Sequence, residues 1–420
     1  MSDSLISGSP LVSIIIPNYN HSRFLGDAIH SALVQTYPNK EIIIVDDGST
    51  DNCREVVDRF GSRVHYIWQN NQGLAGARNT GIRVSNGELI GLLDADDMWK
   101  PSYLEEMIGL AQNYPDAAAY YCQTNCIDVN GNLLPQVMGG PPVDPEEIYW
   151  VLIRSNFIIP STVLLRKSIV IEVGLFDQSL RSCEDWDLWL RLLPDRKIIG
   201  SPLCLVRYRI HGSSLSTNVG GMHDAARAVV KKHFGEDDGQ YDSWSSEKRR
   251  AYGGLYWYQA WTSLSRTKDW EIAKEYLFKA IRTDPTLGEN LDFYYELALG
   301  DQPMGFRGTS QVLNLQTNVE HLVNIFAELE TGTDQIGEKP MYSRFLSKAY
   351  FAFGVLAYNV GEFNLSRLYM FRALKYRWRL ITNKRFDSLF FKALLGKRLI
   401  KYLRNLREST NRGNEHTDRI

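Results

Sequence analysis

Two aspartates separated by one residue follow an apolar segment in the first quarter of the sequence. Residues 89–93 are apolar and lead directly into Asp94, Ala95, Asp96 and Asp97. Carboxylates at positions i and i+2 after a strand can converge on one divalent cation, and such hard oxygen ligands suit Mg²⁺ or Mn²⁺. A diphosphate can complete the ligand shell. The alternative is that these aspartates are solvated turn residues, or cap a helix that begins near Pro101.

A second acidic turn follows another apolar run, at residues 41–45. There Asp46 and Asp47 precede Gly48, in the composition of a turn at the carboxyl end of a strand. A carboxylate at this place can accept a hydrogen bond from a base imide or a ribose hydroxyl, and glycine allows close backbone approach. An ordinary turn between a strand and a helix would have the same composition.

A polar segment at 70–73 (Asn-Asn-Gln-Gly) and the cationic Arg78 come next along the chain. A guanidinium in this segment could reach a nucleotide base or its phosphates. Alternatively, Arg78 is a surface residue of a helix.

The elements that position these residues alternate between strand and helix patterns over the first 210 residues. Short apolar runs at 11–16, 41–45, 64–68 and 88–93 predict strands, and Pro17 is expected to end the first. Ser22 can cap a helix whose apolar residues recur with helical period. This alternation predicts an α/β fold with a doubly wound, mostly parallel sheet. Ligands of such sheets bind beyond the carboxyl ends of the strands, which directs attention to residues 17–20, 46–51 and 94–97.

Four motifs occur in a fixed order on these elements: VSIIIPNYN (12–20), VDDGSTD (45–51), NQGLAGARNTG (71–81) and LLDADD (92–97). Together they closely resemble glycosyltransferase family 2, an inverting family with the GT-A fold of nucleotide-diphospho-sugar transferases. The resemblance covers roughly residues 10 to 215.

The resemblance implies a role for each matching residue. The metal ligand would be Asp96, and the cofactor Mn²⁺ or Mg²⁺. Asp47, with Asp46 beside it, would contact uracil or ribose, and Arg78 the base or the diphosphate. The other residues assigned to nucleotide binding are Pro17, Tyr19 and Asn20 at the end of the first strand, together with Asp94 (on the ribose or in the metal shell) and Ala95.

Two further segments match the family. In it, a Glu-Asp pair at the start of a helix supplies the general base, which implies catalytic roles for Glu184 and Asp185 and assigns the base to Asp185. Such a base takes the proton of the acceptor hydroxyl during in-line attack; the alternative is a carboxylate that stabilises a helix N-terminus. In the segment 208–216, His211 could reach the metal or the diphosphate and Arg209 an oxyanion, although a packed or surface histidine is equally compatible with the sequence.

From about residue 220 the strand patterns end and aromatic-rich helical patterns take over. The spacing of small and aromatic residues resembles tetratricopeptide repeats in two copies. One comprises Trp257, Ala260, Trp261, Leu264, Ala273, Leu277, Ala280 and Pro285; the other comprises Tyr350, Phe353, Gly354, Ala357, Ser366, Met370 and Ala373. Repeats of this kind favour a protein partner.

The segment from Arg372 to Arg407 contains twelve Lys or Arg and one acidic residue, with bulky apolar residues between them. This pattern suits a helix lying on an anionic membrane surface, or a helical cap with a solvated basic face. The net charge of −2 gives no whole-protein field that would favour nucleic acid. Five unpatterned cysteines, a polar N-terminus and no long apolar run predict a cytoplasmic protein, with peripheral attachment to the inner face of the cell membrane as an option.

We therefore predict a flexible N-terminus (1–10), a GT-A domain (11–218), a helical tetratricopeptide-like region with basic C-terminal helices (219–407) and a disordered tail (408–420). The predicted function is inverting transfer of a sugar from a nucleotide-diphosphate donor, by default UDP, to the hydroxyl of a glycan or lipid-linked acceptor. Surface polysaccharide synthesis is the expected context. The alternatives are a scaffold protein acting through its helical repeats, and a sugar nucleotidyltransferase. The latter would need a Gly-rich basic loop after the first strand, where the chain has Pro17-Asn18-Tyr19-Asn20.

Overall fold

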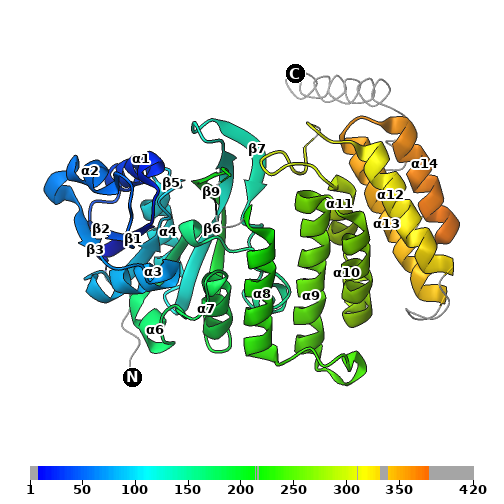
Figure 1. Cartoon of the computed structure of the whole chain (residues 1–420), viewed down its shortest axis with the longest axis horizontal. Helices are drawn as coiled ribbons and strands as arrows, with labels where there is room; N and C mark the ends of the chain where they lie inside the picture. Colours follow the sequence, from blue (N-terminus) through cyan, green and yellow to red (C-terminus); the bar gives the residue numbers. More distant parts are fainter. Residues whose placement is uncertain (1–7, 213, 215–216, 310, 332–338, 378–420) are drawn as a thin grey trace, which may run out of the picture. The chain divides into compact units, whose positions relative to one another are not determined.

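The computed structural model describes residues 8–212, 214, 217–309, 311–331 and 339–377. The chain divides into two compact units (Figure 1). The first runs to Gln259 and includes Met304–Arg307; the second comprises Ala260–Pro303 and the residues from Gly308 on. Most of the basic segment, from residue 378, and the polar tail lie outside the described residues.

Nine strands among the described residues of the first unit form a single sheet, in the order β3-β2-β1-β4-β8-β6-β9-β5, with β7 paired to β6. The leading four strands are parallel, whereas β8, β5 and β7 pair antiparallel with their neighbours. The predicted α/β fold is therefore confirmed. The strands are β1 (Val12–Asn18), β2 (Lys40–Asp46), β3 (His65–Trp68), β4 (Leu89–Leu92), β5 (Met98–Trp99), β6 (Ala117–Ile127), β7 (Leu133–Met138), β8 (Val163–Arg166) and β9 (Lys197–Arg209).

The first strand is buried along its whole length, because helices cover both faces of the sheet. Ile14 and Ile16 belong to the core shared with α1, α2 and α4. Ile15 points to the opposite face, where a Cβ on Gly81 would lie only 2.5 Å from its side chain, so α3 packs closely there. The helices of this unit are α1 (Ser22–Leu33), α2 (Cys53–Asp58), α3 (Gly73–Val84), α4 (Tyr103–Asn113), α5 (Ile148–Leu152), α6 (Lys167–Glu172), α7 (Glu184–Leu192), α8 (Val219–Phe234) and α9 (Ser246–Thr262), which continues into the second unit.

Two local expectations at the end of β1 were wrong. Pro17 does not end the strand, since β1 continues through it to Asn18 in register with β2. Ser22 does not cap α1 but is its first residue, and its backbone N–H donates to Asp51 Oδ2 at 2.9 Å. The carboxylate of Asp51, in a neighbouring turn, thus accepts a hydrogen bond from the first backbone N–H of the helix. This partner is distant in the sequence, so the local pattern could not show it.

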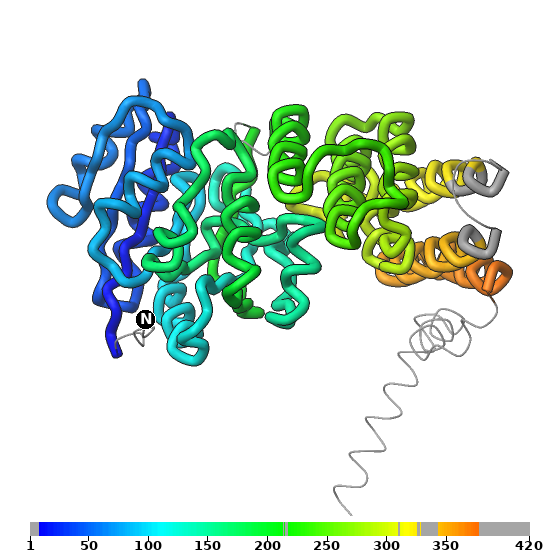
Figure 2. The backbone as a smooth tube through the Cα atoms, turned by 90° about the horizontal axis from the view of Figure 1, so that it is seen from below, coloured from blue at the N-terminus to red at the C-terminus, as the bar shows by residue number. Residues whose placement is uncertain are grey.

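All described secondary-structure elements of the second unit are helices. Its helices after α9 are α10 (Trp270–Thr283), α11 (Leu291–Leu299), α12 (Leu315–Thr331), α13 (Lys339–Asn359) and α14 (Phe363–Tyr376). Helices α13 and α14 lie side by side in both views (Figure 2). A Cβ on Gly354 of α13 would lie 2.7 Å from Met370 of α14, so the small residue allows this approach. The tetratricopeptide likeness itself remains a prediction. Within the described part of the chain, every helix is too short or too polar to span a bilayer.

Candidate active site

The site lies at the edge of the sheet where parallel strands β1, β2 and β4 end. Backbone hydrogen bonds hold the turns together there: Asp47 N–H donates to Asn18 O at 2.8 Å, and Leu93 N–H to Ile15 O at 3.0 Å. Helix α7 begins beside this edge, directly after Cys183, whose φ of 59° lies in the left-handed region. The three segments singled out in the sequence and the Glu184–Asp185 pair therefore meet at one edge, where parallel α/β sheets bind ligands.

Arg78 of α3 joins two of these segments. Its Nη1 donates to Glu184 Oε1 at 2.5 Å, and its Nη2 donates to Asp94 Oδ1 at 2.7 Å. The side chain is 1% exposed, so Arg78 is not a surface helix residue. Contact between Arg78 and a nucleotide stays a prediction, because here the guanidinium faces the two carboxylates.

The charges of this cluster depend on each other. Burial raises the pKa of Glu184, and the charge of Arg78 opposes that rise. The two nearby carboxylates in turn raise the pKa of Arg78, although its own burial acts against them. A guanidinium that stays charged favours the ionised form of the carboxylates beside it.

Replacing Arg78 with Met is expected to lower the free energy of unfolding by about 3–5 kcal/mol, since it leaves buried Glu184 without its partner. Urea unfolding of the Arg78→Met protein measures the effect. Arg83→Met, at an exposed position of the same helix, is the matched control and should change stability by less than about 0.5 kcal/mol. Equal losses in the two variants would contradict a role for the buried ion pairs.

Asp185, the predicted base, is half-buried in the first turn of α7. The amide of Asn156 donates to its Oδ2 at 2.9 Å. Burial raises the pKa of Asp185, whereas the charge of Arg78 and the hydrogen bond from Asn156 lower it. Asn156 was not recognised in the sequence, because nothing in the local pattern of residues 153–159 marks it.

Asp187, two residues along the same helix, has a structural role. It is fully buried and accepts from Arg191 at 2.9 Å and from Lys232 at 2.7 Å; His233 Nε2 lies 2.9 Å away. These hydrogen bonds lower its pKa against the effect of burial. Asp187 therefore ties α7 to α8 and leaves Asp185 as the accessible acid of this turn.

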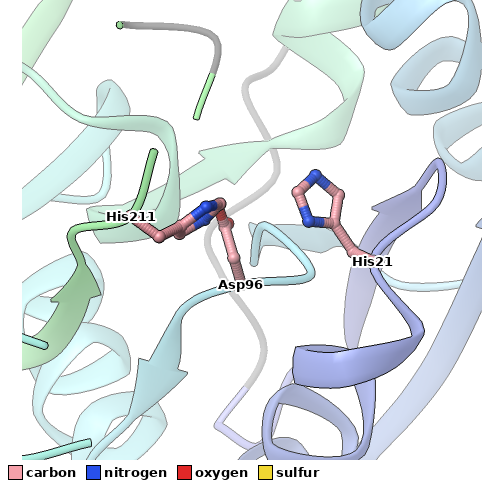
Figure 3. A group of neighbouring side chains, drawn as sticks. All are labelled: His21, Asp96 and His211. Carbon is pink, nitrogen blue, oxygen red and sulfur yellow. The ribbon is translucent and has the colours of Figure 1, made fainter. Parts of the chain in front are cut away.

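A group of metal-ligand side chains lies at the turn that follows β4, which carries Asp96 (Figure 3). The potential ligand atoms of His21, Asp96 and His211 all lie within 4.8 Å of one another. His211 Nε2 is 2.8 Å from Asp96 Oδ2. The structure thus brings together the two predicted ligands and adds His21, which the sequence analysis missed although it directly follows the family-like residues Tyr19 and Asn20.

The donor set fits a divalent cation. A carboxylate and two imidazoles offer one oxygen and two nitrogen ligands, and imidazole suits transition metals better than it suits Mg²⁺. Whether the cation is Mn²⁺ or Mg²⁺ stays a prediction. His21, Asp96 and His211 are the residues that would hold it.

Arg209 is not available to an oxyanion, which corrects the expectation from the sequence. Its side chain is 1% exposed and donates to Asp27 Oδ2, Asp96 O and the backbone carbonyls of Asp128 and Val129. Its backbone N–H donates to Asp97 Oδ1 at 2.9 Å. Arg209 therefore supports the turn that carries the metal-binding carboxylate.

The residues predicted to bind the nucleotide also hold their own turns in place. Asp47 is buried and accepts from Gln69 Nε2, Gln72 N and Gly73 N at 2.6–2.9 Å, so it stabilises the N-terminus of α3. Asp46 accepts from Tyr66 Oη at 2.6 Å, and Asn20 Oδ1 accepts from Thr50 N.

A carboxylate has about four lone-pair sites, so Asp47 retains capacity for one more donor. Tyr19 (47%) and Asn20 are the exposed members of the set, whereas Pro17 and Ala95 are buried. Gly48 has a φ of 80°, and a Cβ there would lie 3.2 Å from Asn71 N. The close backbone approach at this glycine is therefore made by the protein's own backbone at Asn71. Nucleotide contacts by these residues remain predictions.

The chain is similar to known glycosyltransferases. The sequence profile of Glycosyl transferase family 2 matches residues 13–174. An uncharacterized glycosyltransferase of Rickettsia typhi is 34% identical over 206 residues, which cover 48% of this chain and 65% of that protein. TuaG of Bacillus subtilis, described as a glycosyltransferase of teichuronic acid biosynthesis, is 31% identical over 220 residues, which cover 50% of this chain and 82% of TuaG.

The chain therefore belongs to glycosyltransferase family 2. It spans 65% of the length of the relatives from Rickettsia typhi and Rickettsia prowazekii, and about a third of the length of those from three other Rickettsia species. Among solved structures, residues 1–349 of S. aureus TarS in complex with UDP-GlcNAc align with a TM-score of 0.48 at 16% identity, covering 77% of this chain and 92% of that one.

Proposed function

We propose that the protein is a metal-dependent, inverting glycosyltransferase that moves a sugar from a nucleotide-diphosphate donor to an acceptor hydroxyl. The observation that carries the proposal is the pairing of two chemical groups at one edge of the sheet. One is the half-buried carboxylate of Asp185 beside Arg78 and Asn156; the other is the cluster of Asp96, His211 and His21. Family membership supports both assignments.

In this mechanism Asp185 accepts the proton of the acceptor hydroxyl as the oxygen attacks the anomeric carbon from the face opposite the diphosphate. The charge of Arg78 favours the ionised form of Asp185, and the same guanidinium donates to Asp94. A bound divalent cation supplies Lewis-acid stabilisation of the diphosphate that leaves.

We take a UDP-sugar as the donor, because the residues match the family motif. An imide bound by Asp47 would fit UDP, dTDP and GDP alike, so this contact does not itself select the base. A surface polysaccharide or its lipid-linked precursor is the proposed acceptor, in keeping with the described role of TuaG. The helical unit is proposed to contact a protein partner. Attachment to an anionic membrane would involve the basic segment, most of which lies beyond the described residues.

Thermal-shift measurements with UDP-, GDP- and dTDP-sugars in the presence of Mn²⁺ test the donor assignment. A bound ligand raises apparent stability by mass action, by about 2.7 kcal/mol at a ligand concentration of 100 Kd. We expect a UDP-sugar to give the largest shift, and release of UDP on addition of an acceptor glycan. Absence of a shift with all three donors would contradict the proposed function.

A further inference from the structure

Asn156 lies in the connection between α5 and a 3₁₀ turn at Pro160–Thr162, opposite the start of α7. Its Nδ2 donates to Asp185 Oδ2 at 2.9 Å, and its Oδ1 accepts from the backbone N–H of Ile158 at 3.2 Å. Because the N–H of Ile158 requires an oxygen, the amide must present its NH₂ group to Asp185. The orientation of this hydrogen bond is therefore set by the backbone.

The segment that carries Asn156 is fixed to the same helix as Asp185. The indole N–H of Trp186 donates to Leu152 O at 2.7 Å, on one side of Asn156. The indole N–H of Trp189 donates to Ile158 O at 3.4 Å, on the other side. These two hydrogen bonds fix the segment on both sides of Asn156 to α7, the helix that carries Asp185.

Helix α9 supports this segment from behind. A Cβ on Gly254 would lie 1.9 Å from Arg154 O, so the helix backbone packs directly on the backbone of the segment. The guanidinium of Arg250 lies over the ring of Trp150, 4.6 Å from its centroid. The segment that carries Asn156 is therefore supported by α9, a helix that lies outside the residues matched by the family profile.

The charged and titratable groups that act on Asp185 come from three elements. Arg78 from α3 favours the carboxylate, whereas Asp94 after β4 and the adjacent Glu184 oppose it. Cys183 precedes the pair, and burial raises the pKa of its thiol well above the usual range. To these groups Asn156 adds a neutral donor, with no charge of its own.

We propose that Asn156 is a positioning residue of the transfer reaction, which aims the Oδ2 atom of Asp185 and keeps the carboxylate in its basic form. The inference rests on the proposed function, because it needs Asp185 to act as the base. A donor to a carboxylate stabilises the charged form. Loss of the donor therefore raises the pKa of Asp185. As the pH is lowered, the variant should lose activity at a higher pH than the wild type does.

The test measures single-turnover transfer from a UDP-sugar as a function of pH, in the wild type and two variants. Asn156→Asp keeps the oxygen for Ile158 N–H and replaces the NH₂ donor by a second carboxylate. Asn156→Ala removes both groups. We expect the acidic limb to move up by about one to two pH units in Asn156→Ala and further in Asn156→Asp, with UDP binding unchanged.

A matched control exists at the opposite edge of the sheet. Asn86 Nδ2 donates to Glu41 Oε2 at 3.0 Å, so Asn86→Asp places the same substitution beside a carboxylate away from the site. This variant should keep the wild-type pH profile. An acidic limb that stays in place in both Asn156 variants, with wild-type rates, would overturn the inference.

Failure of the proposed function gives a different result. A wild-type protein that transfers no sugar at any pH, or an Asp185→Asn protein that retains transfer, would overturn the base assignment and the role of Asn156 with it. Normal transfer that depends on Asp185, together with unchanged Asn156 profiles, would overturn the role of Asn156 alone.

Discussion

Asp185→Asn is expected to reduce the rate of sugar transfer by about 10²–10⁴-fold, because the amide cannot accept the proton of the acceptor hydroxyl. Nucleotide binding should stay nearly unchanged, since the substitution keeps the shape of the side chain. Single-turnover transfer and calorimetric titration with UDP measure the two effects separately. A loss of catalysis without a loss of binding is the signature of a group that acts in the transition state.

The exposed Asp195, just after the same helix, supplies the control for this substitution. Asp195→Asn should transfer at the wild-type rate. If Asp185→Asn lost UDP binding as well, Asp185 would belong to the donor site, and the base would have to be sought elsewhere.

Asp96→Ala should abolish the Mn²⁺ dependence of UDP binding, because it removes the carboxylate next to His211 and His21. Titration of UDP with and without Mn²⁺ measures this dependence. Mn²⁺ binding to the protein alone, followed by electron paramagnetic resonance, gives a readout that does not require activity. An Asp96→Ala protein with the wild-type Mn²⁺ response would exclude the metal assignment.

The same experiment tests His21. His21→Ala should weaken Mn²⁺ binding. His30→Ala, which changes an exposed histidine within helix α1, the helix that follows His21, should leave Mn²⁺ binding unchanged. Equal affinities in the two variants would restrict the cation site to Asp96 and His211.

Much of the first unit could be predicted because its signals are local. Buried parallel strands read as continuous apolar runs, and the turns after β1, β2 and β4 are marked by Asp, Asn and Gly. Since parallel strands bring their carboxyl ends to one edge, the meeting of Asp94 and Arg78 follows once the strand order is known. The sequence analysis predicted no strand order, which is seen only in the structure.

The remaining features depend on contacts between distant residues. Asn156 reaches Asp185 over 29 positions, and Arg209 is occupied by groups up to 182 positions away. A sequence pattern shows the residue type but not whether its donors are already used. For that reason Arg209 was expected to reach an oxyanion, and the contributions of His21 and Asn156 were missed.

The packing of Gly254 against Arg154 has a consequence for domain exchange among relatives. A recombination point after residue 218 would follow the last strand, yet it would separate the Asn156 segment from the helix on which it rests. It would also remove Lys232 and His233, the partners of Asp187. A chimera that keeps α8 and α9 through Gln259 together with the sheet retains this support. The segment that must be exchanged as one piece is therefore longer than the segment that carries the proposed catalytic residues.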